Sequence, residues 1–429
     1  MPELDFIQTQ TLQEDTRTRG ERARDYAVLA LILLLAYGAF LLGLAIENVW
    51  LLIGYLAVVT TVIYGVRRQK KIGTWFSSLF KANARFASVF ISLLFVLYPV
   101  IFIKDPYLIH LGALSAIFVI MGLGLNITLG FAGLLDVGFA VYFAAGAYTS
   151  AQLAVHFGTS FWIGLPLGGL VAAFFGFIVA WPALRVHGHY LAMVTLGYGM
   201  IMNLLHRNLK FLTNGTDGII NIPPPAIGAF DFLQPITIGG FELPFQANFY
   251  YLALALVAFT IYVSIRLRDS KLGRSWEAIR EDEVAAKCFG VNLTSMKVVA
   301  FSTGAFFGGL GGAVFAHMIG FIHPDNFVLL VSITILASVI IGGMGNIFGV
   351  ALGAVLLTMI PERLREFADL RMLLFGIALL LIMIYRPQGL FPSVRRRREL
   401  QSQKLYGLIE KSGKASAVSG NDVGASAKG

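Results

Sequence analysis

The sequence predicts an all-α fold, a polytopic transmembrane helical bundle of about 10–12 spans. Of the 429 residues, 57% are hydrophobic and 13% are charged, and the mean hydropathy is +0.75; an ordinary soluble domain has about 25% charged residues. Many stretches of roughly 17–20 residues carry no charge, which is the length that an α-helix needs to cross about 30 Å of hydrocarbon. These runs are too long for a β-barrel, whose strands alternate over about 10 residues.

The uncharged stretches define the predicted spans. The first one follows a segment of mixed charge that is too long for a signal-peptide n-region, so we expect an uncleaved signal anchor. A basic segment at 67–85 separates the two leading spans from the rest. The predicted spans are 26–46, 49–66, 86–103, 108–129, 137–155, 162–183, 190–206, 248–266, 298–320, 327–344, 346–361 and 372–386.

Lysine and arginine predict that both termini lie in the cytosol. The loop 67–85 holds six of these residues, the loop 266–297 holds seven, and four consecutive arginines begin at Arg395. The predicted outer loops hold almost none, except for three arginines at 363–371. Cytosolic loops are enriched in Lys and Arg, so the net charge of +9 indicates membrane edges in contact with lipid rather than a nucleic-acid partner.

The sequence contains no recognisable catalytic, cofactor-binding or metal-binding motif. There is no phosphate-binding loop, the seven histidines are scattered without an H-E-x-x-H pattern, and "GGMGNIFG" at 342–349 lacks the dinucleotide spacing. The single cysteine, Cys288, excludes an intrachain disulfide and a cysteine-based zinc site. We therefore expect no enzymatic activity, no metal and no cofactor in this chain, and any ATP must be bound by a partner subunit.

Small residues recur every four positions in several predicted spans, which lets helix backbones approach closely in lipid. Two interpretations remain open: tight packing within one bundle, or a face that moves during transport. The expected packing positions are Gly304, Gly308 and Gly312, then Gly345, Gly349 and Gly353, and also Gly164, Gly168 and Gly176.

The stretch "WEAIREDEVAAKCFGV" at 276–291 is charged and helix-prone, although apolar spans flank it. Ser275 is the predicted N-cap of a short helix, with Glu277 in the first turn. Gly290 suits the position just past the helix end, and Asn292 is expected to cap the next span. The basic loop around this helix places it in the cytosol.

One side of this short helix offers apolar contacts. A cytosolic helix of this kind suits docking into a groove of a soluble partner, and the alternative interpretation is a solvated linker helix. The apolar residues concerned are Trp276, Ile279, Ala286 and Phe289.

Several motifs in the same order resemble the branched-chain amino acid permease family of ABC importers, and most closely its LivM-type members. The segment "GRSWEAIREDEVAAKCFGVN" resembles the coupling loop of ABC-importer permeases, with its Glu-Ala-Ala-x-x-x-Gly pattern. In this chain Val284 is inserted after Glu283, the glutamate of the pattern, and Gly290 is its final glycine. The other matching stretches are "NITLGFAGLLDVGFAVYFAAGAY" at 126–148, "HGHYLAMVTLGYG" at 187–199, "TNGTDGI" at 213–219, "VIIGGMGNIFGVALGA" at 339–354 and "YRPQGLFP" at 385–392.

The resemblance implies an importer in the bacterial inner membrane. Its expected partners are a sister permease subunit of the LivH type, two cytosolic ATPase subunits and a periplasmic amino-acid binding protein. The coupling helix would sit in a groove of one ATPase and transmit its closure to the spans. The residues implied in this helix are Trp276, Glu277, Ile279, Arg280, Glu283, Ala285, Ala286, Phe289 and Gly290.

The basic segment at 67–85, the extent of the resemblance and the composition of the last 30 or so residues, rich in Ser, Ala, Gly and Lys, divide the chain into four parts. The predicted domains are a cytosolic N-terminal segment at 1–25, an N-terminal extension at 26–104, a permease core at 105–392 and a disordered basic cytosolic tail at 393–429.

Asp136 is the one acid inside the apolar region 108–155. An intramembrane acid usually faces a cavity or a partner, and the flanking Gly133 and Gly138 predict a broken helix, as in other transporters. Asp136 is thus a candidate to pair with a substrate ammonium, or alternatively caps a half-helix at the cytosolic edge. Asn126 and Thr195 are weaker candidates to line the pathway, since Thr195 also suits a bond to a carbonyl one turn back.

The sequence leaves two other functions open. A urea or short-chain amide permease of the same family tends to read Gly-x-Leu-Ser-Leu-Gly-His where this chain has the segment 133–139. An ion-coupled secondary carrier needs no ATPase partner and tends to bury more ionisable groups. The function expected first is the permease subunit for leucine, isoleucine and valine.

Overall fold

The computed structural model describes residues 19–45 and 83–363, apart from residues 184, 185, 187, 229, 239 and 240, together with a few isolated positions outside these ranges. Most of the predicted spans at 49–66 and 372–386, and the whole predicted tail at 393–429, lie outside the described residues. The chain divides into two units, one built mainly from residues up to Phe102 and one from Ile103 onward.

The first unit contains two helices that coincide with the predicted spans 26–46 and 86–103. They are α2 (Arg19–Ala45) and α5 (Ala84–Ile101). The Tyr37 hydroxyl of α2 donates a hydrogen bond to the Leu94 carbonyl of α5 at 2.9 Å. A small apolar cluster supports this contact, made by Leu29, Leu79 and Ala87.

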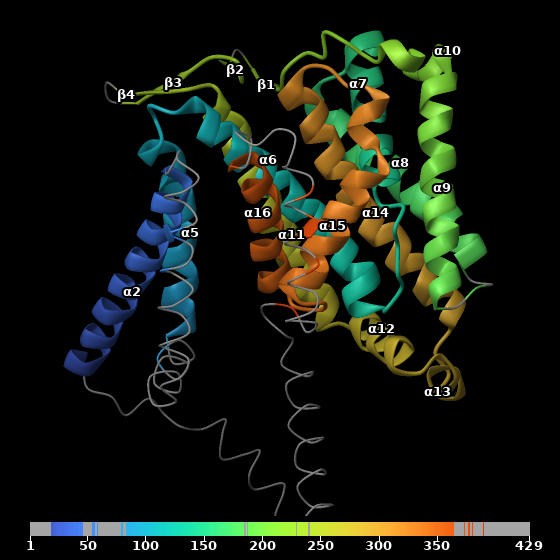
Figure 1. Ribbon diagram of the computed structural model, residues 1–429, viewed down its shortest axis with the longest axis horizontal. Coiled ribbons are helices and arrows are strands. Elements are labelled where there is room, and N and C mark those ends of the chain that lie inside the picture. Colours follow the sequence, from blue (N-terminus) through green and yellow to red (C-terminus); the bar gives the residue numbers. More distant parts are fainter. Residues whose placement is uncertain are drawn as a thin grey trace, which may run out of the picture. The chain divides into compact units, whose positions relative to one another are not determined.

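The second unit is a helical bundle with two short β-hairpins (Figure 1). Its first helix begins with Pro106, whose missing N–H costs nothing in the first turn. In chain order the elements are α6 (Pro106–Leu125), the π-helix η1 (Asn126–Phe131), α7 (Ala140–Phe157), α8 (Phe161–Ala183), α9 (His189–Asn208), α10 (Lys210–Thr213), η2 (Gly215–Asp217), β1 (Ala226–Ile227), β2 (Phe230–Asp231), β3 (Ile236–Ile238), β4 (Phe241–Leu243), α11 (Gln246–Arg268), α12 (Lys271–Glu281), α13 (Glu283–Cys288), α14 (Leu293–Ile319), η3 (Pro324–Phe327), α15 (Leu329–Gly342) and α16 (Ile347–Arg363).

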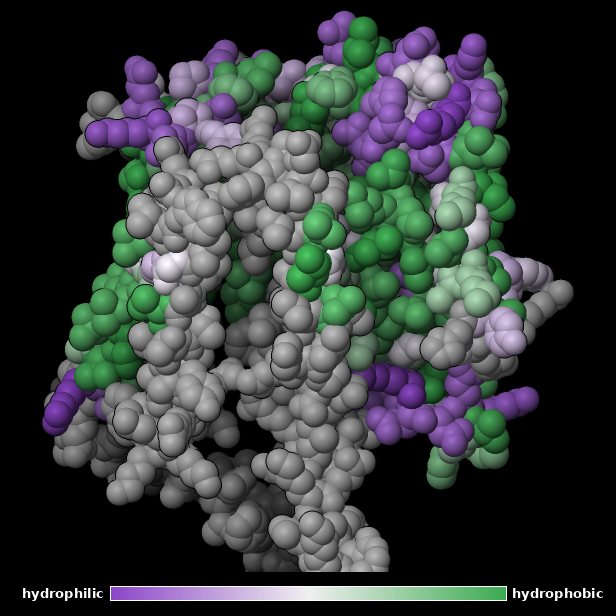
Figure 2. Space-filling model, viewed as in Figure 1, coloured by the Kyte–Doolittle hydropathy of each residue, from purple (hydrophilic) through white to green (hydrophobic). Residues whose placement is uncertain are grey.

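These helices confirm the predicted fold class. Six helices in the described part of the chain are long and apolar enough to cross a membrane, and two more apolar helices are shorter. Helices α7 and α9 also coincide with predicted spans but are not among the six. Hydrophobic side chains cover the middle of the second unit and hydrophilic ones gather at its two ends (Figure 2), as expected for a multi-pass membrane protein.

Helix α14 lies at the centre of the second unit, against α6, α7 and α8. Its glycines are at the contacts: a Cβ atom on Gly304 would lie 2.8 Å from the Gly124 carbonyl oxygen, and one on Gly308 would lie 3.1 Å from the Phe139 ring. A Cβ atom on Gly312 would overlap the Phe143 carbonyl. These glycines therefore let α14 pack directly against the backbones of its neighbours.

The prediction for the second glycine series is partly wrong. Gly345 precedes α16 and has a φ of +82°, so it belongs to the turn between α15 and α16 and not to a helix face. Gly349 and Gly353 do lie on α16, where Gly342 of α15 approaches the backbones of both. The four-residue spacing predicts a helix that includes Gly345, but this glycine lies in the turn before α16 and matches the spacing by chance.

The second unit has two distinct ends, separated by the length of α14. A helix of 27 residues is about 40 Å long, close to the full thickness of a bilayer. Helices α12 and α13 lie at the N-terminal end of α14, and the strands and η3 lie at the other end (Figure 1). At that far end Ile219 pairs with Ile322 in an isolated bridge.

Candidate functional site: the coupling segment and the broken helix

The charged stretch forms two helices, α12 and α13, and not the single helix predicted. Ser270 caps α12 by accepting from the Gly273 N–H, and Asp282 caps α13 by accepting from Val284 N at 2.8 Å. The prediction that Ser275 is the N-cap is wrong, because the helix begins earlier and the Ser275 hydroxyl donates to the Lys271 carbonyl. The extended backbone of Asp282 interrupts the helix.

The exit from the segment follows the prediction. Gly290 adopts a φ of +81° just past α13, a conformation that glycine reaches without strain. The Asn292 side chain then accepts a hydrogen bond from Ser295 N at 3.2 Å and caps α14. The coupling segment, residues 271–290, thus leads directly into the central helix.

The apolar side of the coupling segment packs against the rest of this chain and does not face solvent. Trp276, Ile279 and Ala286 are buried, and the Trp276 indole N–H donates to the Met296 carbonyl at 2.8 Å. The prediction that these three side chains offer contacts to a soluble partner is therefore wrong. The exposed apolar side chains are Phe289, at 88% exposure, and Val284, at 74%; sequence analysis missed Val284 as a contact.

The same end of the unit carries water-facing charge. Arg268 closes α11, and its guanidinium donates to the exposed Asp269 carboxylate at 2.8 Å. This hydrogen bond lowers the pKa of Asp269. Charges of this kind agree with an end that meets water.

Arg280 connects the coupling segment to the end of the π-helix η1. Its guanidinium donates to the Gly130 carbonyl at 2.5 Å. Its aliphatic stem covers Gly133, where a Cβ atom would lie 2.8 Å from Arg280 Cγ. Gly133 has a φ of +72°, so both space and backbone conformation favour glycine here.

Asn126 connects the start of the π-helix to the turn between α15 and α16. Its Oδ1 accepts from Gly345 N at 2.9 Å, and the side chain is buried. The π-helix is therefore held at one end by Asn126 and at the other by Arg280. π-helical segments are rare and are often found at functional sites.

The helix that begins with α6 is interrupted near Asp136, as the sequence predicts. Helical structure stops at Phe131 and resumes at Ala140. Asp136 is fully buried in the connecting loop, and its Oδ1 accepts from Gly138 N at 3.0 Å. Among the described residues, no hydrogen bond reaches Asp136 Oδ2.

Thr195 and two tyrosines surround this loop. The Thr195 hydroxyl accepts from Val137 N at 3.0 Å and donates to the Ala192 carbonyl at 3.1 Å. Tyr142 shares a side-chain hydrogen bond with Asp136, and Tyr198 interacts with it electrostatically. Sequence analysis missed both tyrosines, although Tyr198 lies three residues after Thr195, on the same face of α9.

The described residues include no group of three or more His, Cys, Asp or Glu side chains that could hold a metal ion. The arrangement instead offers a buried carboxylate beside phenol groups, and a hydrogen bond from the coupling segment to the helix break.

Comparison with known proteins identifies the family. Residues 107–383 match the family model described as "Branched-chain amino acid transport system / permease component". This chain belongs to that family. The match takes in the broken helix and the coupling segment, and it leaves α2 and α5 outside.

Individual members of this permease family show the same relationship. The chain is 40% identical over 327 residues to the high-affinity branched-chain amino acid transport system permease protein LivM of Salmonella typhimurium, covering 72% of this chain and 76% of that one. It is also 40% identical over 311 residues to LivM of Escherichia coli, covering 70% and 73%. A more distant relative is the autoinducer 2 import system permease protein LsrC of Escherichia coli, 31% identical over 200 residues, or 45% of this chain and 52% of that one. No solved structure matches this chain.

Proposed function

We propose that this chain is the transmembrane permease subunit of an ATP-driven importer for leucine, isoleucine and valine. Its family membership and its 40% identity to two LivM proteins support the substrate class. The observation that carries the mechanism is the hydrogen bond from Arg280 to the Gly130 carbonyl, because it connects a water-facing helix to a break within the bundle.

The partners in this proposal are a sister permease subunit of the LivH type, two cytosolic ATPases and a periplasmic binding protein. The complex lies in the bacterial inner membrane with both termini of this chain in the cytosol. ATP binds to the partner subunits, and this chain is not an enzyme. The exposed apolar side chains of Val284 and Phe289 support α13 as the part that meets an ATPase.

Closure of the ATPases would move the coupling segment as one body with α14. Trp276 anchors α12 to the start of α14 through the Met296 carbonyl, and Arg280 passes the movement to η1. A π-helix lacks the regular i→i−4 ladder, so it is a suitable place for a helix to change its path. Asn126 extends the connection to the turn at Gly345.

The substrate ammonium would pass near Asp136. The carboxylate has one oxygen without a hydrogen-bond partner among the described residues, and the buried Tyr142 and the partly buried Tyr198 lie beside it. A buried acid in a transport protein is a functional candidate by default. The helix break around it also exposes backbone groups that suit a polar substrate.

The test is uptake into proteoliposomes that contain the whole complex, with ATP inside and loaded binding protein outside. We expect uptake of radiolabelled L-leucine that depends on ATP and is blocked by excess valine and isoleucine but not by urea. Uptake of urea in place of leucine would favour the amide-permease alternative. Leucine uptake by the chain alone, driven by an ion gradient, would contradict the proposal.

A further inference from the structure

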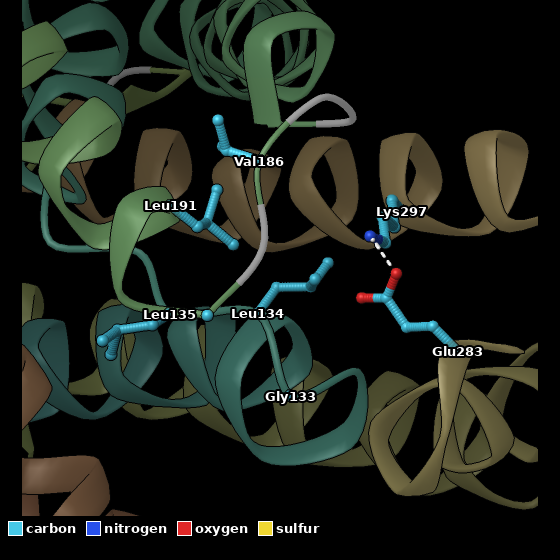
Figure 3. A pocket seen from close by; sticks show the side chains of 8 residues that line it. Gly133, Leu134, Leu135, Val186, Leu191, Glu283 and Lys297 are labelled. Atoms are coloured by element: carbon cyan, nitrogen blue, oxygen red, sulfur yellow. Dashed lines mark hydrogen bonds and ion pairs between the residues drawn. The ribbon is translucent and has the colours of Figure 1, made fainter.

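A cavity of about 200 Å³ lies between the coupling segment and the loop that follows the π-helix (Figure 3). Clefts for drug-sized ligands measure about 300–1,000 Å³, so this cavity has the size class of a smaller molecule. Four aliphatic residues, two glycines and one ion pair line it. The residues used below are Leu134, Leu135, Val186, Leu191, Glu283 and Lys297.

The ion pair is unusual because one partner is almost fully buried. Lys297 Nζ lies 2.7 Å from Glu283 Oε2, and the side chains are 4% and 28% exposed. Lysine is almost never buried without a partner. Lys297 belongs to the central helix α14 and Glu283 to α13, so the pair joins the coupling segment to the bundle. In Figure 3 the Leu134 side chain points toward the two charged groups.

An ion pair beside an aliphatic wall is complementary to a zwitterion with an aliphatic side chain. A molecule of this kind would place its ammonium on Glu283 and its carboxylate on Lys297, so every charge stays compensated. A simple amine would leave the buried charge of Lys297 unmatched, which is costly. A simple carboxylate would lack the ammonium group that contacts Glu283. The aliphatic branch would lie against the leucines and Val186, which favours branched-chain over small amino acids.

We propose that this cavity binds free branched-chain amino acid that has accumulated in the cytosol, and that binding slows further import. The proposal rests on the proposed function, since that function supplies the ligand class and the cytosolic side. To enter between the two charges, the ligand must separate Glu283 from Lys297. Separating the two side chains would move α13 away from α14. It would also shift the loop at Gly133, which the aliphatic stem of Arg280 covers.

The direct test is equilibrium binding of radiolabelled L-leucine to the purified complex of permeases and ATPases, without binding protein. We expect saturable binding, at least about tenfold weaker for isopentylamine, 4-methylpentanoate and glycine, each of which lacks one recognised group. Lys297→Met should weaken binding of leucine by a similar factor. The matched control is Lys210→Met, an exposed lysine on α10, which should keep wild-type affinity.

A second variant keeps both charges. Leu134→Trp enlarges the side chain that points toward the ion pair (Figure 3), so it should block the cavity. This variant tests the proposal even if Lys297→Met fails to assemble. At saturating loaded binding protein, free L-leucine should lower ATP hydrolysis by the wild-type complex several-fold, and Leu134→Trp should abolish this inhibition.

Two results would overturn the inference. One is no saturable binding of leucine, and the other is binding that neither Lys297→Met nor Leu134→Trp changes, as expected for a site in the transport pathway. ATP-driven leucine uptake without such binding would defeat only this inference. Binding at this cavity without ATP-driven leucine uptake would defeat the proposed function instead.

Discussion

Asp136 and Asn126 are both buried polar residues next to the helix break, and each uses one side-chain atom to hold the backbone. Asp136 accepts from Gly138 N, and Asn126 accepts from Gly345 N. The second polar atom of each, Asp136 Oδ2 and Asn126 Nδ2, has no hydrogen-bond partner among the described residues. An unsatisfied buried polar group costs about 1–3 kcal/mol, so we expect a substrate or water to reach both.

Asp136→Asn tests the substrate role of the acid. Asparagine keeps the oxygen that accepts from Gly138 N, so the loop and assembly should survive. Loss of a charge-assisted hydrogen bond to the substrate ammonium removes about 1.5–3 kcal/mol, so leucine uptake should fall about tenfold or more. Uptake kinetics in proteoliposomes are the measurement.

The control for Asp136→Asn is Asp269→Asn, which changes an exposed carboxylate at the end of α11 and should leave uptake unaltered. Near-normal uptake by Asp136→Asn would show that this residue only closes the local turn.

The helices of the second unit meet along small residues, and α14 has the densest set. Glycine contacts on α14 bring its backbone against α6, α7 and α8. The coupling segment in turn packs through Trp276 at the base of the same helix. The packing of the bundle and the position of the coupling segment therefore depend on one element.

Gly312→Ala tests the close packing of α14. The added methyl group would overlap the Phe143 carbonyl, and overpacking costs about 1–3 kcal/mol. We expect a lower melting temperature of the purified complex. Gly197→Ala on α9 is the matched control, because nothing lies within 4 Å of the added atom. Equal melting temperatures for the two variants would refute direct backbone contact at Gly312.

Replacing Val284 and Phe289 tests the proposed docking surface on α13. Both are exposed, so changing both to serine should leave folding and membrane insertion intact. Burying a side chain of this size contributes about 1.5–3 kcal/mol, so ATPase retention in a pull-down should fall tenfold or more. Lys271→Ser on α12 is the control. Undiminished retention would mean that the ATPases bind elsewhere.

At the scale of the whole molecule, Cys288 reports which end of the second unit faces the cytosol. It is the only cysteine in the chain and lies exposed on α13. An impermeant maleimide should label it in inverted vesicles and not in spheroplasts. Phe211→Cys in a Cys288→Ser background should show the opposite pattern, because the exposed Phe211 lies at the other end. Labelling of Cys288 from outside would reverse the orientation.

The sequence predicted most helices of the described part because each is a long apolar run with local end signals such as Gly290 and Asn292. It failed where the outcome depends on distant partners. The burial of Trp276 depends on Met296 twenty residues later in the chain, and the role of Arg280 depends on Gly130. Gly345 was misassigned because periodicity alone does not distinguish a helix from the turn before it.

In the proposed mechanism, Arg280 transmits ATPase movement from the coupling segment to the broken helix. The most direct test measures leucine uptake and ATP hydrolysis in the same proteoliposomes, for the wild type and for Arg280→Met. Arg274→Met, which changes an exposed arginine on the same helix, is the control. We predict that the amount of leucine taken up per ATP falls about tenfold or more in Arg280→Met, because a charge-assisted hydrogen bond of about 1.5–3 kcal/mol is lost, while the control keeps the wild-type ratio. An unchanged ratio in Arg280→Met would contradict the account.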